Sequence, residues 1–448
     1  MIEKGVRIMR RVSLQQLNWE QYQADFNALA AIGQNAEGGM DRLGYGEADQ
    51  AAHKLLADMA VEAGFEVKWD GAGNLWITRR GEEDGNPDFP PILLGSHMDT
   101  VPNGGKYDGL LGVMTAFHAM RLLDRVPQRR TVTLIVFRCE ESSRFNCATI
   151  GSKLLAEQLT GEMLKRYVDK DGISAYDAIR ELGGSPDNLY LERQYIKDSF
   201  GFIEMHIEQG PVLNDRRTDI GIVSHIAAPH RFRITVEGAA AHSGACPMDA
   251  RQDALTGAAE IILAVERLGR QYAEKRIVAT VGKCDVVNGA MNIVPGKVEL
   301  YVDIRGIDRE VISEVVNKLH QEMSAIASSR NLRIDPAILS QETPVKLDDD
   351  MAEFLVEQCL KNMLTFLHMT SGAGHDTMYM AKLTRSALFF VPCEKGISHN
   401  KEEAVVDDAV QNGLRLMFST LVRICTLDPQ EEREKAEMDR MLLEEAYQ

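Results

Sequence analysis

Hydrophobic residues in the first half of the chain follow two patterns that alternate with each other. Apolar runs of strand length, each bounded by polar or glycine-containing segments, lie at 74–78, 91–96, 131–139 and 200–205. Segments with apolar residues at helical spacing lie at 48–64 and 110–124. The runs are typical of buried strands, and the spaced segments are typical of helices that pack on a sheet. This alternation predicts a mostly parallel sheet with helices on both faces.

Between about residue 216 and residue 341 the order of the pattern changes. The predicted elements are, in turn, a strand at 230–238, a helix at 253–269, strands at 276–287 and 297–306, a helix at 309–329 and a strand at 332–340. A β-α-β-β-α-β order of this kind forms a small ferredoxin-like α+β domain of its own.

The first pattern returns after this region, which indicates an insertion. A helix at 351–364, a strand at 386–393 and a helix at 405–425 are predicted. We therefore expect an α/β catalytic domain from residues 1–214 and 342–448, interrupted by an α+β domain at 215–341. The charged end of the chain, 430–448, predicts an amphipathic surface helix.

Composition and charge exclude several classes of function. The chain has 448 residues, 44% hydrophobic and 26% charged, and its net charge is −17. A nucleic-acid groove needs a concentrated basic face, and no basic stretch supplies one. No apolar run approaches the ~18 residues of a membrane span, and the N-terminal segment lacks an apolar signal core, so we expect a cytoplasmic protein. Seven cysteines without a C-x-x-C pair suit reduced thiols, and Cys139 and Cys147 are interpreted as small core residues.

Five side chains lie where an open α/β sheet places a metal site. They are His97, Asp108, Glu141, His206 and His399, most of them in or just after predicted strands. Ligands bind at the carboxyl ends of such strands. Asp99 follows His97 by two residues, and a carboxylate that accepts the second ring N–H orients a ligating imidazole.

The acidic pair Glu140-Glu141 ends an apolar strand, and burying two carboxylates together without a cation or protons is very costly. Imidazole and carboxylate ligands without cysteine suit zinc, manganese or cobalt. One glutamate can then bind metal while its neighbour takes a proton from water. Four other histidines lie on apolar runs and are predicted to be core residues: His53, His118, His320 and His368.

Several motifs carry a resemblance to a known family. The strings are GSHMDTVPNGGKYDG, EESSRF, HIEQGPVL, AHSGACPMD, MNIVPGKVELYVDIRG, SGAGHD and GISHN. Together they resemble the di-metal amidohydrolase branch of the aminoacylase and carboxypeptidase superfamily. Within that branch they resemble N-carbamoyl-L-amino acid hydrolases and allantoate amidohydrolases. The resemblance runs in the same order from about residue 25 to residue 420.

The resemblance implies a role for each matching position. One divalent ion would be bound by His97, Asp108 and His206, and the other by Asp108, Glu141 and His399. Glu140 would be the general base, with Asp99 and His242 assisting catalysis. The substrate contacts would be Gln209, His242, Asn292, Arg305 and the backbone near Gly372. Arg305 suits an α-carboxylate because a guanidinium makes a planar, bidentate contact.

The activity implied is hydrolysis of the carbamoyl C–N bond of an N-carbamoyl-L-amino acid, a small substrate with ureido and carboxylate groups. Allantoate hydrolysis is the alternative within the same chemistry, followed by aminoacylase or dipeptidase activity and by an inactive metal-binding scaffold. Relatives pair through the inserted lid domain, so a homodimer is expected. The chain departs from the usual family pattern at Ala241–Met248 and at Ser142, and both departures affect the expected preference for a side chain rather than the chemistry.

Overall fold

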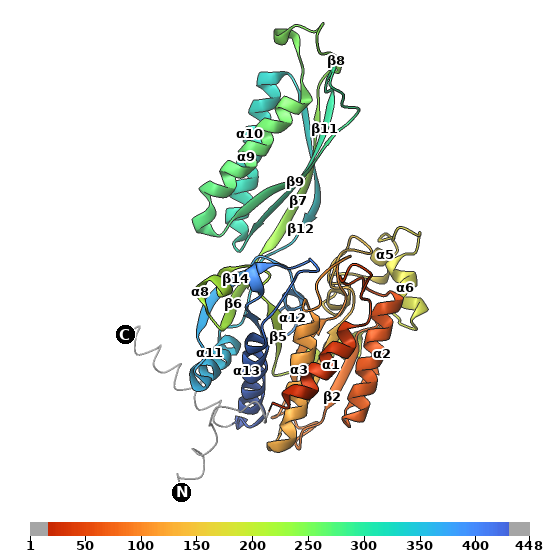
Figure 1. The fold of residues 1–448 in the computed structure, drawn as a ribbon, viewed down its shortest axis with the longest axis vertical. Coiled ribbons are helices and arrows are strands. Elements are labelled where there is room, and N and C mark those ends of the chain that lie inside the picture. Colours follow the sequence, from red (N-terminus) through yellow and green to blue (C-terminus); the bar gives the residue numbers. More distant parts are fainter. Residues whose placement is uncertain (1–16, 430–448) are drawn as a thin grey trace, which may run out of the picture. The chain divides into compact units, whose positions relative to one another are not determined.

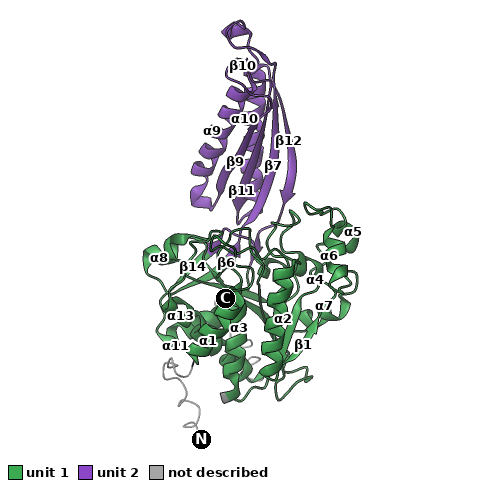
Figure 2. Ribbon diagram, turned by 45° about the vertical axis from the view of Figure 1, so that its right-hand side comes forward, with its two compact units in different colours: residues 1–224, 347–369, 375–448 green, residues 225–346, 370–374 purple. Residues whose placement is uncertain are grey.

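The computed structural model describes residues 17–429 and divides into two compact units, which Figure 2 shows in different colours. The first unit comprises residues 1–224, 347–369 and 375–448, and the second comprises 225–346 and 370–374. The second unit starts at His225 rather than at residue 215, and residues 221–223 of the strand at 220–226 pair with a strand of the first unit. The short piece 370–374 belongs to the second unit, where Ala227 N–H donates to the carbonyl of Ser371.

The first unit is built on a mixed sheet. Its strands are β1 (Glu66–Trp69), β2 (Leu75–Arg79), β3 (Ile92–His97), β4 (Val132–Phe137), β5 (Gly201–Ile207), β6 (Ile220–Ile226), β14 (Phe366–Ser371) and β15 (Ser386–Val391). The order is β1-β2-β4-β3-β5-β15-β6, with β14 paired to β6. The four central strands β4, β3, β5 and β15 are parallel, and every residue in them is buried. This confirms the predicted mostly parallel sheet, because strands covered on both faces are mostly apolar.

Helices cover the sheet. They are α1 (Trp19–Ala30), α2 (Glu47–Glu62), α3 (Leu110–Leu122), α4 (Ile150–Leu155), α5 (Gly161–Leu164), α6 (Ala175–Glu181), α7 (Tyr190–Lys197), α8 (Val212–Arg216), α11 (Asp349–Asn362), α12 (Thr377–Met380) and α13 (Asp407–Cys425). Helix α3 is apolar on nearly all sides and buried along its length, since it lies between β3 and β5 on one side and α1 and α13 on the other (Figure 1). Burial of this kind fixes the start of α3 rigidly, next to Asp108.

The second unit is a four-stranded antiparallel sheet with two helices. Its strands are β7 (Ala228–Glu237), β9 (Val278–Val286), β11 (Lys297–Gly306) and β12 (Arg333–Gln341), in the order β12-β7-β11-β9. Helices α9 (Ala254–Gln271) and α10 (Arg309–Arg330) pack on it, and Asp253 and Asp308 cap their first turns. Buried and half-buried residues alternate along β11, so one face of the strand packs on the helices. This is the predicted ferredoxin-like order.

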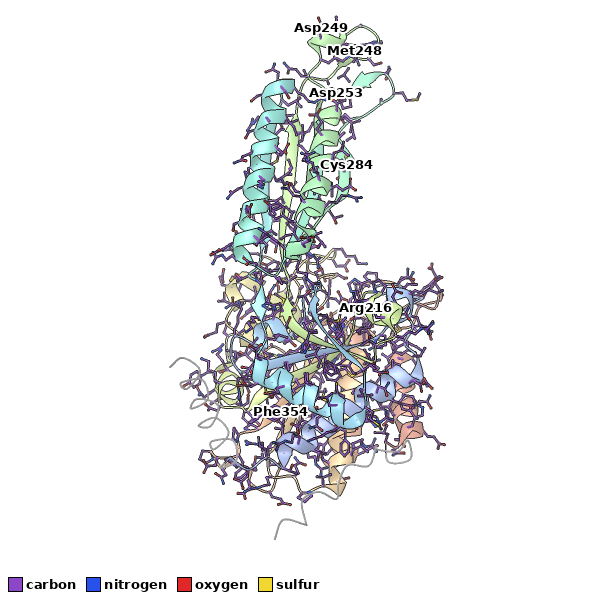
Figure 3. The ribbon with its side chains drawn as sticks, turned by 90° about the vertical axis from the view of Figure 1, so that its left-hand side faces the viewer. Arg216, Met248, Asp249, Asp253, Cys284 and Phe354 are labelled. Atoms are coloured by element: carbon purple, nitrogen blue, oxygen red, sulfur yellow. The ribbon has the colours of Figure 1, made fainter. Side chains whose placement is uncertain are left out.

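The second unit also carries small strand pairs. A ribbon of β8 (Ala241–His242) and β10 (Ile293–Val294) lies beyond the start of α9. Figure 3 shows Met248 and Asp249 at the same end of the second unit, above Asp253 in that view. The last pair joins β13 (Val345–Lys346) to the end of β6. Short 3-10 turns lie at Leu123–Arg125, Met248–Ala250, Ala273–Lys275 and Glu394–Gly396.

Of the four histidines predicted to be core residues, two are buried and two are exposed. His53 and His118 are buried and pair with Asp49 and Asp25, as expected of core histidines. The core prediction is wrong for His320 and His368, which are exposed because they lie on the outward faces of their elements. Cys139 and Cys147 are buried. Across residues 17–429 no helix combines the length and the apolar character that crossing a bilayer requires, and the predicted C-terminal helix at 430–448 lies outside the described residues.

Candidate metal centre

Five side chains of the first unit form two adjacent groups of potential ligands that share Asp108. The first group is His97, Asp108 and His206, and the second is Asp108, Glu141 and His399. Within each group the ligand atoms lie within 4.8 Å of one another. The structure thus brings together all five residues that the sequence singled out.

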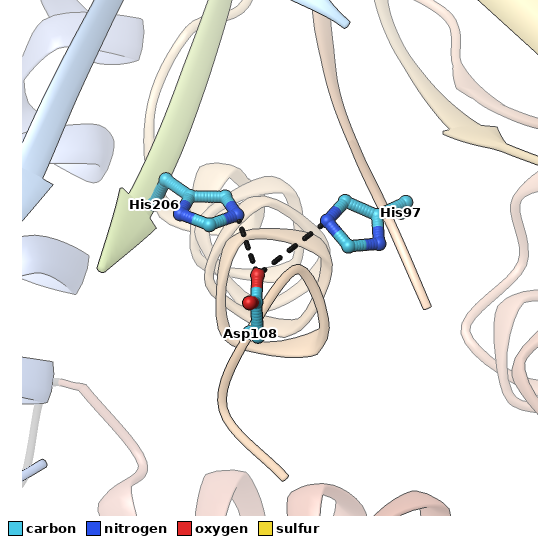
Figure 4. A group of neighbouring side chains, drawn as sticks. All are labelled: His97, Asp108 and His206. Carbon is cyan, nitrogen blue, oxygen red and sulfur yellow. Dashed lines mark ion pairs between the residues drawn. The ribbon is translucent and has the colours of Figure 1, made fainter. Parts of the chain in front are cut away.

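The first group comes from two neighbouring strands of the sheet and from the loop before α3 (Figure 4). His97 is the last residue of β3, His206 is near the end of β5, and Asp108 lies just before α3. The Nε2 atom of His206 is 2.9 Å from Asp108 Oδ1, and that of His97 is 3.6 Å from the same oxygen. All three side chains are buried.

The second group uses loops as well as the sheet edge. His399 Nε2 lies 3.2 Å from Asp108 Oδ2 and 3.1 Å from Glu141 Oε1. The His399 side chain is 49% exposed, whereas Glu141 is buried. Because Oδ1 of Asp108 faces the first group and Oδ2 faces the second, this carboxylate is placed to bridge two cations.

The donor set fits two divalent ions. Three imidazole nitrogens and two carboxylates converge, and none of the nearby ligand atoms is a cysteine sulfur. Asp108 Oδ1 is buried and accepts no hydrogen bond of regular geometry. A buried carboxylate oxygen in this position is costly unless a cation or a proton satisfies it.

Main-chain carbonyls orient two of the ligating imidazoles. The Nδ1 atom of His206 lies 2.9 Å from the carbonyl oxygen of Ile207, and that of His97 lies 3.1 Å from the carbonyl oxygen of Asp99. An Nδ1–H that donates to a carbonyl leaves Nε2 as the lone-pair donor, directed at Asp108. For His97 the expected partner was the Asp99 carboxylate, which lies farther from Nδ1, at 3.5 Å.

The Asp99 carboxylate instead positions the acidic pair. Its Oδ1 accepts the main-chain N–H of Glu140 and its Oδ2 accepts that of Glu141, each at 3.0 Å. Cys139, just before the pair, has a φ of 56°, in the left-handed region that residues other than glycine rarely adopt. This turn and the Asp99 contacts take Glu140 and Glu141 out of strand alternation, so that Glu141 reaches the second group.

Burial and neighbouring charges shift the pKa values of the candidate ligands and of Glu140. Burial lowers the pKa of His97 and His206, but the neighbouring carboxylates outweigh it and raise both above the usual value. Hydrogen bonds to Asp108 and Glu141 raise the pKa of His399 to about 11. Burial, with Glu141 and Asp376 adding to it, raises the pKa of Glu140 well above its usual value. Without metal the carboxylates therefore hold protons on the imidazoles, and cations would take the place of those protons.

The predicted substrate residues lie in both units. In the first unit Gln209 donates from Nε2 to Asp108 Oδ2 at 2.9 Å, with a φ of 57°. In the second unit Arg305 donates from Nη1 to the carbonyl of Gly372 at 2.7 Å, so two predicted contacts meet. Asp303 occupies the Nε and Nη2 side of the same guanidinium.

His242 and Asn292 also meet in the second unit. The carbonyl of Asn292 accepts the Ser243 N–H, and His242 pairs with Ile293 across the β8–β10 ribbon. His242 is exposed, and its Nδ1 accepts the N–H of Gly244 at 3.1 Å. That bond places the ring proton of a neutral His242 on Nε2, which makes Nε2 a donor.

Sequence reasoning missed two residues next to the ligands. Buried Glu403 accepts the main-chain N–H groups of Tyr107 and Asp108, and Ser398 lies between Glu403 and Asp108 Oδ2. The only signal available was the acidic pair Glu402-Glu403 shortly after His399, which looks like solvated charge in the sequence.

A mostly parallel α/β sheet with two candidate ligand groups that share one carboxylate, and with a glutamate beside them, is typical of a metal-dependent hydrolase. Residues 93–423 match the family described as Peptidase family M20/M25/M40. The chain belongs to this family, and it is an amidohydrolase within it.

Relatives and solved structures agree with this assignment. The chain is 33% identical to an N-carbamoyl-L-amino-acid amidohydrolase of Pseudomonas sp. (strain NS671), over 90% of this chain and 98% of that protein. It is 33% identical to a ureidoglycolate hydrolase of Arabidopsis thaliana (90% and 86%) and 31% identical to an allantoate amidohydrolase of Escherichia coli K12 (88% and 95%). A hydantoinase/carbamoylase family amidase from Burkholderia multivorans has a TM-score of 0.83 at 29% identity, covering 91% of this chain and 98% of that one. These matches confirm the resemblance that the motifs indicate.

Proposed function

We propose that the protein hydrolyses N-carbamoyl-L-amino acids to the amino acid, ammonia and carbon dioxide, in the cytoplasm. The observation that carries the proposal is the Asp108 carboxylate, whose two oxygens face two separate ligand groups beside half-buried Glu140. Zinc or manganese would occupy both groups, with cobalt as a third option. The proposed ligands are those of the two groups above.

Bound cations would polarise the ureido carbonyl and make water acidic enough to react near neutral pH. Glu140 removes the proton from the attacking water, because it is next to the ligand Glu141 and binds no cation itself. The oxygen adds to the carbamoyl carbon, and the C–N bond to the amino acid breaks. Glu140 returns the proton to the departing nitrogen, and the released carbamic acid decomposes to ammonia and carbon dioxide.

Arg305 is the proposed contact for the substrate carboxylate. Asp303 and the Gly372 carbonyl hold the guanidinium in place, and planar donor geometry distinguishes it from a lysine. We expect Arg305→Lys to raise KM about tenfold or more, because a point charge cannot make two parallel hydrogen bonds. The control is a substrate whose α-carboxylate is amidated, which should bind the parent enzyme poorly. Equal turnover of amide and acid would remove Arg305 from this role.

His242 and Asn292 are proposed to complete the site of a partner subunit in a homodimer. The Nε2–H of an exposed His242 suits an oxyanion that develops on the carbonyl oxygen. His242→Ala and Glu140→Ala should each be inactive, and heterodimers formed from the two should recover activity, since one of their sites then has both residues intact. Verified heterodimers without recovery would place His242 in the site of its own subunit or outside catalysis.

The substrate itself is decided by a panel assay on purified, metal-loaded protein. The panel contains N-carbamoyl-L-amino acids, allantoate, ureidoglycolate, N-acetyl amino acids and dipeptides, with ammonia and amino-acid release measured for each. We expect the highest kcat/KM for an N-carbamoyl-L-amino acid. Allantoate is the second candidate because it also offers ureido and carboxylate groups. Aminoacylase or dipeptidase activity would show as amino-acid release without ammonia. An inactive scaffold would turn over none of these substrates. Such a protein needs no general base, so the presence of Glu140 argues against it.

A further inference from the structure

A buried carboxylate outside the ligand groups joins two distant loops of the first unit. Glu403 is 5% exposed. Its Oε1 accepts the main-chain N–H of Tyr107 at 2.8 Å and that of Asp108 at 3.1 Å. Its Oε2 lies 2.9 Å from the hydroxyl of Ser398. Glu403 therefore holds the loop that carries Asp108 against the loop that carries His399.

Ser398 continues this connection into the ligand group. Its Oγ lies 3.1 Å from Asp108 Oδ2, the oxygen that faces His399. His399 follows Ser398 directly and has a φ of 54°, a conformation that needs support from its surroundings. The Glu403–Ser398 contact supplies that support from within the same loop.

Glu403 packs directly against Gly105 and leaves no room for a side chain at that position. A Cβ at Gly105 would lie 2.1 Å from Glu403 Oε1, and Gly105 does not have a positive φ. Glycine is therefore needed at this position for space rather than for backbone conformation. This gives an independent way to displace the carboxylate without changing it.

We propose that Glu403 is a positioning residue that selectively sets the affinity of the second ligand group. Two of the three ligands in that group, Asp108 and His399, lie on the segments that Glu403 joins, whereas the first group has only Asp108 there. Contacts made by residues behind the ligands typically account for a 10–100-fold difference in metal affinity. The inference rests on the proposed function only in that cations bind at these residues.

The test is calorimetric titration of the metal-free protein with Zn²⁺ or Mn²⁺, without substrate. Two binding events are expected, one for each ligand group. Glu403→Ala should weaken the event that fills the second ligand group by about 10–100-fold. The matched control is Glu402→Ala, which removes an exposed carboxylate from the adjacent position and should leave both affinities unchanged within about twofold. Loss of equal size at both events, or no loss at either, would overturn the proposal.

Single-site backgrounds assign the effect to a group. In His399→Ala, which lacks the second group, adding Glu403→Ala should change the remaining affinity by less than about twofold. In His206→Ala the same addition should weaken the remaining site by about 10–100-fold. The reverse pattern would show that Glu403 acts on the first group.

Gly105→Ala keeps the proposal testable if Glu403→Ala folds poorly. The added methyl should displace the carboxylate and reproduce the selective loss, and thermal unfolding with and without metal reports on folding. A folded Gly105→Ala protein with two unchanged affinities would count against the proposal. Normal binding of two metals by a parent protein that hydrolyses no ureido substrate would overturn the proposed function while leaving the role of Glu403 intact.

Discussion

The two ligand groups share Asp108 but differ in the backbone that carries them. His97 and His206 come from neighbouring parallel strands, and main-chain carbonyls fix their rings. His399 comes from a loop with a left-handed backbone and is about half exposed. A ligand on a buried strand is positioned by the core, whereas a ligand on a loop depends on local contacts. The first group is therefore expected to bind its ion more tightly than the second.

The largest effect is expected from the loss of Asp108, the residue that the two groups share. Asp108→Ala removes the carboxylate that faces both, so it should abolish binding of both ions and all activity. Elemental analysis after dialysis measures the metal content of the purified variant. Two metals per chain in Asp108→Ala would show that the two groups do not depend on a shared Asp108.

Substitutions in the acidic pair distinguish the general base, Glu140, from the ligand of the second group, Glu141. Glu140→Gln keeps volume and cannot take a proton, so kcat should fall by about 10²-fold or more while both ions remain bound. Glu141→Gln should lose the second ion in preference to the first, because Glu141 lies 3.1 Å from His399 and belongs to that group alone. Steady-state kinetics combined with metal analysis distinguishes the two, and reversed phenotypes would exchange their roles.

Substituting one histidine of each group tests which of the two groups binds its ion more tightly. His399→Ala should remove only the weaker binding event in a titration, since His97, Asp108 and His206 stay in place. His206→Ala should remove the tighter event. If His399→Ala removed the tighter event instead, the loop-borne group would be the stronger one.

The smallest effect concerns protons. Asp108 and Glu141 raise the pKa of His399 to about 11, so its imidazole is charged at pH 7 in the metal-free protein. Filling the second group must then release about one proton from His399, and affinity should rise with pH. Titration in buffers of different ionisation enthalpy counts the protons. A second event that releases no proton, with an affinity that does not change with pH, would contradict this expectation.

The sequence by itself determined the sheet and the choice of the candidate ligands. The sequences of β3, β4, β5 and β15 are largely apolar because strands buried on both faces carry few polar residues, and His97 and His206 stand out at the ends of such runs. The alternation in β11 likewise predicts the second unit. Neither β1 nor β14 has such a pattern, since β1 is largely exposed and β14 is mostly half-buried.

Only the tertiary structure decided how the ligands are supported. Asp99 looks like a partner of His97 in the sequence, yet its carboxylate binds the backbone of Glu140 and Glu141. Glu403 looks like surface charge, yet it is buried against a backbone segment almost 300 positions earlier in the chain. Apolar periodicity reports on burial within one element, but a polar side chain is directed by whichever distant donors the fold brings to it. Such pairings have no local signal, because they exist only after the loops at the strand ends have met.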